Sequence, residues 1–546
     1  MSDAREVDAY DQASLESFTS DLVAAGFEPV PDTERRIWEG PADAALAPLT
    51  SAERMRLVFC DGWPVEFPRL LVDGLHTNHQ TAGGYVCLWH DGDGSGEWIT
   101  LDGFLKRLDE WCHDAVHGWD PDGLARDAYL NFMPKLASVA TFDLGKLRIS
   151  TPGAWGSLHG VLHSVDHVSL HYGYRSERDH LRGLWFQTDS LDVPPRNLAE
   201  LRGALNRSQA RGLERDLASR QDVGPLQQSG AVDLILFAWN HEGTRHLLVL
   251  ALKGAGDEVR ALALKPGPTD KESLMLRAGP DAALLKNKTI AVFGAGALGG
   301  HVALTLAECG VTRLRLVDGD NLLPENAVRH VAGRRFVGSP KPAAVARVIR
   351  EHAPWTDVQE LPRSLTTPAD VAKAIAGVDL VVDATGTQAT TQALCISGIT
   401  HAIPVVSGAL YRGGSVSRVR RQGFPADTPI LQRTQDLGYV LIPPGSNDDE
   451  ILPAVGCSGP VTNAPPSTVL AASAMIAEVV IDALTERFGH GDEVIDVLRA
   501  LPGEPPFDHV GKLMLRSRVG ALPSHRCAGT QAVSKVLPNC TRITTQ

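Results

Sequence analysis

The chain has 546 residues and a formal net charge of −13, with 43% hydrophobic and 21% charged residues. This balance is typical of a globular protein, and the length predicts several domains rather than one core. The acidic charge argues against a nucleic-acid-binding protein, and the short apolar runs argue against a membrane-spanning segment. The polar, acidic N-terminus has no apolar signal sequence, so we expect a cytoplasmic protein.

Eight cysteines are scattered along the sequence, and none forms a Cys-x-x-Cys pair. This spacing argues against a zinc site built from paired cysteines, and the chain length argues against a disulfide scaffold. We expect most of them to be small buried side chains and one or two to be reactive thiols.

Residues 1–150 predict an α+β domain with short strands between two helices. Apolar residues recur at helical spacing in the first and last segments, and glycine and proline interrupt the middle. The expected elements are a helix at residues 11–27, strands at 35–38, 55–59 and 85–89, and a helix at 101–111.

Residues 151–275 give weaker patterns, and we interpret them as a linking domain. A charged helical segment is expected at 197–221. Two apolar runs, 232–239 and 246–252, flank an Asn-His-Glu-Gly sequence that is typical of a hairpin turn.

Residues 276–505 alternate strands with helices, which predicts a mostly parallel sheet of the Rossmann-like α/β class. A loop rich in Pro, Gly and Asp precedes the last helix, and residues 506–546 are assigned to a C-terminal tail. The expected strands are 289–293, 314–317, 380–382 and 404–406, and the expected helices are 301–309, 341–351 and 468–484.

A glycine-rich turn joins the first of these strands to a helix. Gly294 permits a tight turn, Gly296 lets a phosphate approach the backbone, and Gly299 completes the pattern. Asp318 ends the next strand, where an acid can hydrogen-bond ribose hydroxyls. Taken alone, the pattern predicts a site for NAD, FAD or ATP; the alternative is a turn that binds nothing.

Basic residues after the second strand favour ATP over NAD. Asn326, Arg329 and Lys341 follow Asp318 closely in the sequence. Cations at this place can clamp a triphosphate and stabilise the charge that develops as pyrophosphate leaves, which hydride transfer does not require. The alternative is a solvated basic loop.

The run GAGALG, VDGD, ENAVRH, VGSPK resembles the adenylation domain of the superfamily that contains ThiF, MoeB and the ubiquitin-activating enzymes. The resemblance implies ATP and Mg²⁺ as cofactors, a homodimer, and Arg329 as a residue that acts in catalysis. Carried over by position, the nucleotide-binding residues are Gly294, Gly296, Gly299, Asp318, Asn326, Arg329 and Lys341.

One position departs from this family pattern. The family has Asp-x-x-Asp after the next strand, and its second acid serves the metal; here Gly386 replaces that acid. Asp383 matches the first acid and is therefore our candidate for holding Mg²⁺.

Two cysteines are candidate acyl carriers, since a thiolate attacks an acyl-adenylate and forms a transferable thioester. Cys457 lies in AVGCSGP, and members of the family that form thioesters have a cysteine at a similar place. The alternative is an incidental loop cysteine.

Cys87 lies in a segment that resembles the ubiquitin-conjugating fold. There, a His-x-Asn motif precedes the catalytic cysteine, Cys-Leu follows, and a tryptophan opens a helix. His76, Asn78, Leu88 and Trp98 fit that order, and an Asn side chain can stabilise an oxyanion. Whether Asn78 or His79 faces the cysteine is open.

The chain is thus expected to have a conjugating-like domain, a linking domain and an activating-like domain, in that order. This domain order resembles the bacterial fusion proteins of ubiquitin-like conjugation operons, as in CBASS anti-phage defence. The resemblance implies that a protein C-terminus, on a cGAS-like nucleotidyltransferase or a ubiquitin-like protein, is activated with ATP. It passes through Cys457 and Cys87 to a target amine. Two alternatives are a sulfur-carrier adenylyltransferase, in which Cys87 is idle, and a non-catalytic nucleotide-binding module, which Gly386 favours.

Overall fold

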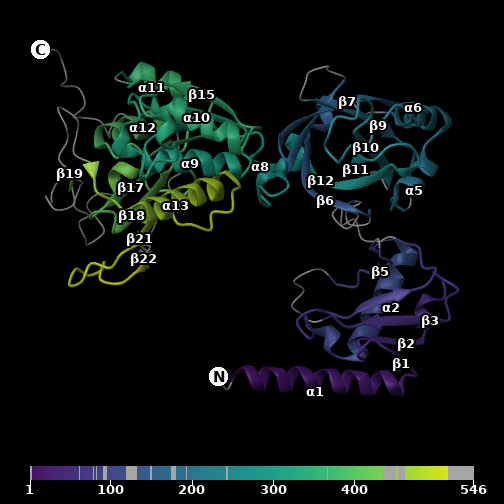
Figure 1. The fold of residues 1–546 in the computed structure, drawn as a ribbon. Helices are drawn as coiled ribbons and strands as arrows, with labels where there is room; N and C mark the ends of the chain where they lie inside the picture. The colour runs from purple at the N-terminus through teal and green to yellow at the C-terminus, as the bar shows by residue number, and fades with distance from the viewer. Residues whose placement is uncertain are drawn as a thin grey trace, which may run out of the picture. The chain divides into compact units, whose positions relative to one another are not determined.

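The computed structural model divides into two compact units, Met1–Leu274 and Met275–Gln546 (Figure 1). The structure describes residues 3–60, 62–77, 79–81, 83–89, 95–118, 129, 132–147, 151–173, 180–191, 193–241, 244–365, 367–433, 451–452 and 461–513.

The N-terminal part of the first unit is an antiparallel sheet with strands in chain order, preceded and followed by a helix. Phe18, Trp63, Phe104 and Trp111 belong to its buried core, so both helices are held by large aromatic side chains. The predicted order of helix, strands and helix is confirmed. The elements are α1 (Asp3–Ala24), β1 (Glu28–Pro29), β2 (Ile37–Pro41), β3 (Arg54–Val58), β4 (Arg69–Val72), β5 (Tyr85–Val86) and α2 (Leu101–His117).

The remainder of the first unit is a closed barrel in the order β10-β11-β12-β6-β8-β7-β9, with α5 (Leu198–Ala204) and α6 (Arg207–Ala218) in its 197–221 segment. The predicted hairpin is confirmed as β10 paired with β11, in which Trp239 lies opposite His246. The strands are β6 (Lys135–Phe142), β7 (Trp155–Ser164), β8 (His167–Tyr172), β9 (His180–Gln187), β10 (Leu234–His241), β11 (Thr244–Lys253) and β12 (Arg260–Pro268).

Strand β6 pairs with β12 and β8, so it is part of the barrel. It nevertheless lies within residues 1–150, the range assigned above to the N-terminal domain. The division between the sheet and the barrel therefore comes before Lys135.

A buried ion pair supports the barrel. Arg220 Nη1 lies 3.0 Å from Asp233 Oδ1, and the two side chains are 0% and 1% exposed. Asp233 Oδ1 also accepts from the backbone N–H of Ser229 at 2.9 Å. Both charges therefore have several partners, as buried charges require.

We expect Asp233→Ala to lower the free energy of unfolding by about 3–5 kcal/mol, because the Arg220 charge would stay buried without its counterion. Urea denaturation measures this change. Glu360→Ala, which removes the partner of the half-exposed Arg350, is the matched control and should cost less than about 1 kcal/mol. Equal losses in the two variants would contradict the structural role of the buried pair.

The second unit is built on an eight-stranded sheet in the order β15-β14-β13-β16-β17-β18-β21-β22. The strands from β15 to β17 are parallel to one another, and the remaining pairs are antiparallel. The strands are β13 (Thr289–Phe293), β14 (Arg313–Val317), β15 (Asp357–Leu361), β16 (Leu380–Asp383), β17 (Val405–Tyr411), β18 (Val416–Gln422), β21 (Glu493–Val497) and β22 (Gly511–Leu513). The Rossmann-like prediction is confirmed, and the sheet extends past residue 505, where the predicted tail begins.

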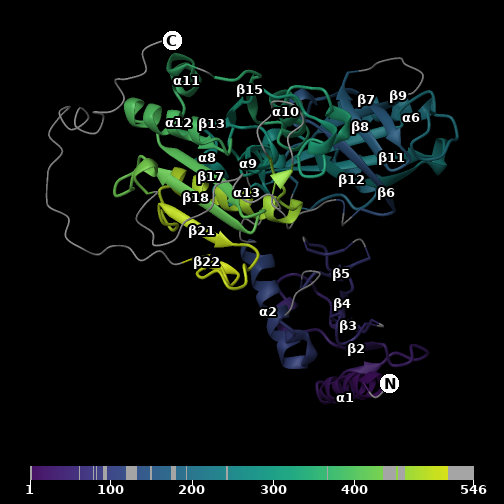
Figure 2. The same cartoon turned by 90° about the vertical axis from the view of Figure 1, so that its left-hand side faces the viewer.

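Helices cover both faces of this sheet (Figures 1 and 2). Val292 shares one core with α9, α10 and α13, whereas Phe293 shares another with α11 and α12. Burial on both faces explains why β13 is a continuous apolar run. The helices are α9 (Ala297–Glu308), α10 (Lys341–His352), α11 (Pro368–Ile375), α12 (Gln388–His401) and α13 (Pro466–Leu484).

Helix α13 is long and apolar enough to cross a membrane, with a mean hydropathy of 1.7. It is mostly buried, and Ile476, Val480 and Leu484 belong to the core that also contains Val292. A core helix of a globular domain has the same composition, so we interpret α13 as a core helix.

Candidate nucleotide site and candidate thiols

The three glycines of the turn between β13 and α9 have different structural roles. Gly294 has a φ of 88°, and a Cβ there would lie 2.8 Å from the Ala384 carbonyl oxygen. A Cβ on Gly299 would lie 1.7 Å from the Gly294 carbonyl oxygen, whereas one on Gly296 would meet nothing within 4 Å. Gly294 and Gly299 are therefore required by close packing, and Gly296 leaves open space in front of the helix.

Helix α9 begins at this open space. Gly296 is its N-cap, and no side chain caps the helix. The N–H groups of its first turn are thus available to an anion, and the helix dipole favours negative charge there. The predicted helix began at residue 301, four residues too late, because the Ala-Leu-Gly-Gly sequence was interpreted as part of the turn.

Asp318 follows β14 and fixes the position of the glycine turn. Its Oδ2 accepts from the backbone N–H of Ala295 at 2.8 Å, and its Oδ1 accepts from the backbone N–H of Asp320 at 2.8 Å. The carboxylate is half-buried. Each carboxylate oxygen can accept more than one hydrogen bond, so these contacts leave capacity for ribose hydroxyls.

His330 is a residue of this site that the sequence reasoning missed. Its Nδ1 accepts from the backbone N–H of Ala332 at 3.0 Å, so Nε2 carries the proton and donates to the Ala295 carbonyl at 2.8 Å. Burial lowers the pKa of His330, which favours this neutral form. Ala295 is therefore held from both sides, by His330 and by Asp318. The sequence feature that could have indicated His330 is its position directly after Arg329.

Lys341 lies at the start of α10, and its side chain is 14% exposed. Its Nζ lies 2.7 Å from Asp320 Oδ2, and its backbone N–H donates to the Asp320 carbonyl at 2.9 Å. Because the Asp320 N–H donates to Asp318, and Asp318 accepts from Ala295, hydrogen bonds connect Lys341 to the glycine turn. The structure thus brings together the predicted glycines, Asp318 and Lys341.

Asn326 and Arg329 lie on the loop between β14 and α10. Asn326 Oδ1 accepts from the backbone N–H of Leu323 at 3.0 Å, which closes the short turn Pro324–Asn326. Arg329 is half-buried, and burial lowers the pKa of its guanidinium, which stays charged at neutral pH. In this structure, the Asn326 side chain therefore shapes the loop that carries Arg329.

Asp383, the candidate metal ligand, is 1% exposed at the end of β16. Its Oδ1 accepts from the Thr385 N–H at 3.1 Å and from the Thr385 hydroxyl at 2.7 Å. Its Oδ2 accepts from Ser407 Oγ at 2.9 Å and from the Thr391 hydroxyl. A metal would have to displace these donors, so the geometry does not favour the predicted Mg²⁺ role. Among the described residues, no group of three His, Cys, Asp or Glu side chains is placed to hold a metal.

We expect Asp383→Ala to lower the free energy of unfolding by about 2–4 kcal/mol, because the Ser407 and Thr391 hydroxyls lose their acceptor. The Mg²⁺ concentration for half-maximal ATP–pyrophosphate exchange should stay unchanged in the folded variant. A Mg²⁺ titration, with Asp383→Asn as the variant that keeps an acceptor, checks this. A clear increase in the Mg²⁺ requirement of both variants would restore the metal role.

Cys87 directly follows β5 and is half-buried. Its backbone N–H donates to the His79 carbonyl at 2.8 Å, and Arg107 Nε from α2 donates to the Leu88 carbonyl at 2.8 Å. Trp98 Nε1 donates to the Pro64 carbonyl at 2.8 Å. His79 therefore lies opposite Cys87 in the backbone pairing.

Four further residues named in the sequence analysis differ in what the structure shows of them. Asn78 and Cys457 lie outside the described residues, so their roles stay predictions. His76 is described and precedes the turn that contains His79. Gly386 has a φ of 66°, which a glycine adopts readily and an aspartate rarely, so the departure from the family pattern coincides with a left-handed backbone.

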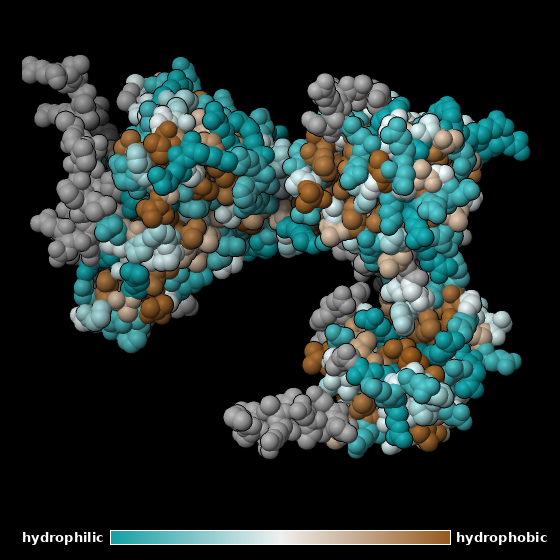
Figure 3. All heavy atoms as spheres, viewed as in Figure 1, coloured by the Kyte–Doolittle hydropathy of each residue, from teal (hydrophilic) through white to brown (hydrophobic). Residues whose placement is uncertain are grey.

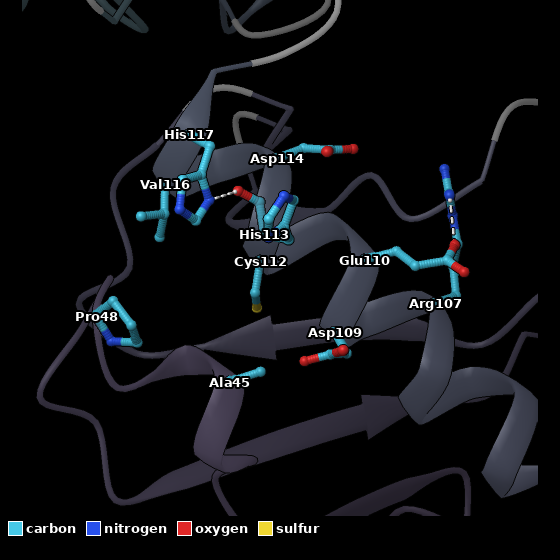
Figure 4. A pocket seen from close by; sticks show the side chains of 10 residues that line it. All are labelled: Ala45, Pro48, Arg107, Asp109, Glu110, Cys112, His113, Asp114, Val116 and His117. Atoms are coloured by element: carbon cyan, nitrogen blue, oxygen red, sulfur yellow. Dashed lines mark hydrogen bonds and ion pairs between the residues drawn. The ribbon is translucent and has the colours of Figure 1, made fainter.

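Cys112 lines a surface hollow of about 640 Å³ beside α2 (Figure 4). The thiol points from α2 towards the segment that carries Ala45. Burial, together with Asp43 and Asp109, raises the pKa of Cys112 to about 11. Burial likewise raises the pKa of Cys395 to about 12. Both thiols stay protonated at neutral pH, so neither is a good nucleophile.

Comparison with known proteins identifies part of the second unit. Residues 273–491 match the ThiF family. The name ThiF domain refers below to this matched segment. The match confirms the resemblance drawn from the glycine turn, Asp318 and the Asn-x-x-Arg motif.

Curated relatives are similar to parts of the chain. The chain is 32% identical over 196 residues to the uncharacterized protein y4qC of Sinorhizobium fredii, covering 33% of this chain and 34% of that protein. It is 33% identical over 172 residues to the adenylyltransferase and sulfurtransferase MOCS3-1 of Zea mays, covering 30% and 36%. It is 30% identical over 224 residues to the ATP-dependent ubiquitin transferase-like protein Cap2 of Pseudomonas aeruginosa, covering 39% of each. The chain thus spans little more than a third of the length of these relatives.

Solved structures give weaker likenesses. The structure of PaaA has a TM-score of 0.34 at 17% identity and covers 43% of this chain and 66% of that chain. The structure of E. coli MccB with ATP has a TM-score of 0.32 at 16% identity and covers 44% and 67%. These TM-scores are too low to support a fold assignment, so the fold of the ThiF domain is assigned from its strand order alone.

Proposed function

We propose that the chain activates the C-terminal carboxylate of a protein with ATP, as an adenylyltransferase, and transfers it through two thiols to an amine. The observation that carries the first step is the open space at Gly296, where α9 begins, in a turn that hydrogen bonds link to Asp318 and, through Asp320, to Lys341. The ThiF domain and the names of the relatives MOCS3-1 and Cap2 support the same chemistry.

The proposed activation step uses the residues of the ThiF domain. The N–H groups of α9 bind phosphate, Asp318 binds ribose, and Lys341 and Arg329 stabilise negative charge. The carboxylate oxygen of the partner attacks the α-phosphorus, and pyrophosphate leaves with the electron pair of the broken P–O bond. The products are an acyl-adenylate and pyrophosphate. Mg²⁺ stays a proposed cofactor, and the described residues contain no group of three His, Cys, Asp or Glu side chains placed to hold it.

The transfer steps use Cys457 and then Cys87. The Cys457 thiolate attacks the acyl carbon and releases AMP, and the Cys87 thiolate then takes the acyl group by thioester exchange. An amine of the target attacks this thioester, loses a proton, and releases the Cys87 thiol as the amide forms. The helix, sheet and helix order around Cys87 supports a ubiquitin-conjugating-like domain.

ATP–pyrophosphate exchange tests the activation step. The full chain is incubated with ATP, labelled pyrophosphate, and a protein or peptide with a free C-terminus. Exchange should require that carboxylate, and a C-terminally amidated substrate is the matched control. Exchange that is equal with the amide would refute carboxylate activation.

The proposed partner is a cGAS-like nucleotidyltransferase or a ubiquitin-like protein, as in CBASS defence. The relatives named Cap2 in Pseudomonas aeruginosa and Vibrio cholerae support this setting. A homodimer and a cytoplasmic location are also proposed. The loop before α10 has three exposed apolar residues, Leu323, Val328 and Val337. On the face drawn in Figure 3, hydrophobic residues are intermixed with hydrophilic ones. Such residues can form a subunit interface.

A second candidate is a sulfur-carrier adenylyltransferase, which the name of the Zea mays relative favours. In that case, the partner's C-terminus is adenylated, but no acyl group reaches Cys87. Mass spectrometry of the peptide that contains Cys87, after a single turnover, distinguishes the two functions.

A further inference from the structure

Arg420 on β18 is half-buried, and among the described residues it has no counterion of its own. Its Nε is buried with no hydrogen-bond acceptor, and the described residues give its side chain no hydrogen bond or ion pair. The nearby Arg418 has a buried Nη2 without an acceptor, although its Nε is paired with Glu493 at 2.5 Å. An arginine offers five N–H donors, so this pair can accommodate an anion.

The nearby acids Glu493 and Asp492 form their ion pairs with arginines other than Arg420. Glu493 is shared between Arg418 and Arg433, and Arg433 is also paired with Asp492. Among the described residues, Arg418, Arg420 and Arg433 therefore share two acids, Glu493 and Asp492. Arg420 has no ion pair of its own among these residues, so an anion here would form charge-assisted hydrogen bonds with it.

The sheet register relates Arg420 to the nucleotide site. Phe293, Asp383, Ser407 and Arg420 lie opposite one another in the adjacent strands β13, β16, β17 and β18. Strands β13 and β16 end in this row, whereas β17 continues for four residues to Tyr411. The β17–β18 hairpin therefore extends past the edge where the glycine turn lies.

The two faces of this hairpin have different neighbours. Gly408 packs against Ile476 of α13, and Leu410 shares a core with Val469 of α13. Because side chains alternate along a strand, Ser407 and its partner Arg420 lie on the opposite face. Arg420 therefore faces away from α13, beside the edge where the reaction is proposed.

We infer that Arg420, together with Arg418, binds an acidic side chain in the C-terminal tail of the protein that is activated. The inference rests on the proposed function. If Asp318 binds the ribose, as proposed, the nucleotide lies on the β14 side of the glycine turn, and the carboxylate approaches over β16, β17 and β18. Strands lie about 4.8 Å apart and an extended chain advances about 3.3 Å per residue. The acidic residue should therefore stand roughly three or four positions before the terminal residue.

Short synthetic peptides with a free C-terminus test this inference. One series moves a single glutamate along the peptide, and a matched series has glutamine at the same positions. Adenylation is followed as pyrophosphate release by the full chain with ATP, and kcat and KM are separated. We expect glutamate at the third or fourth position before the end to lower KM roughly tenfold against glutamine, through charge-assisted hydrogen bonds. Arg420→Gln should abolish this preference, and Arg420→Glu should favour lysine at the same position.

Controls separate this inference from the proposed function. Arg350→Gln, on the surface of α10, should keep the preference for glutamate. Since Arg420 has no partner in the described structure, Arg420→Gln should keep the melting temperature of the wild type. A wild type that treats glutamate and glutamine peptides equally, or an Arg420→Gln variant that raises the KM for ATP instead, would overturn the inference. A wild type that releases no pyrophosphate with any peptide, ubiquitin-like proteins included, would overturn the proposed function itself.

Discussion

Lys341→Ala is expected to slow ATP–pyrophosphate exchange about 10²–10³-fold. The Lys341 ammonium is mostly buried and paired with Asp320, whose backbone N–H is bonded to Asp318. This arrangement keeps a positive charge beside the glycine turn, where charge develops on the departing pyrophosphate. Exchange kinetics at saturating ATP and partner measure the effect.

Two controls for Lys341→Ala test whether the effect depends on the location of the lysine and whether the variant is folded. Lys373→Ala, on the exposed side of α11, removes a lysine far along the chain from the site and should leave exchange unchanged. The circular dichroism spectrum of Lys341→Ala should match that of the wild type. Wild-type exchange by folded Lys341→Ala would refute the assignment of Lys341 to the nucleotide site.

Cys457→Ala is expected to abolish every thioester, whereas Cys87→Ala should leave the acyl group on Cys457. A thioester requires a thiol, and the proposed order makes Cys87 depend on Cys457. Non-reducing gels with a labelled partner, compared with and without a reducing thiol, measure both variants. Cys60→Ala is the matched control, since it replaces a half-buried cysteine of the same N-terminal domain.

The two cysteine variants also decide between the candidate functions. Normal conjugation by Cys87→Ala would exclude the N-terminal domain from transfer and would favour the sulfur-carrier alternative. A thioester that survives Cys457→Ala would show that Cys87 takes the acyl group directly from the adenylate.

The sequence by itself determined the local features of the ThiF domain. The strand Thr289–Phe293 was predicted with its observed bounds, and Asp318 was correctly placed after the next strand. These features are readable because a buried parallel strand is a short apolar run and a tight turn requires glycine within a few residues. The glycine spacing and the Asn-x-x-Arg motif also sufficed for the family resemblance.

Only the tertiary structure decided which side chains meet across the fold. The barrel depends on β6 pairing with β12, more than a hundred residues later in the chain. His330 holds Ala295 across 35 residues, and Asp383 accepts hydrogen bonds from Thr385, Thr391 and Ser407. Among the described residues, Arg420 on β18 has no counterion of its own. Hydrophobic periodicity says which face of an element is buried, but it does not say which strand lies beside it. Hydrogen-bond saturation and counterion balance depend on those neighbours, and the expectation for Asp383 and the proposal for Arg420 rest on them.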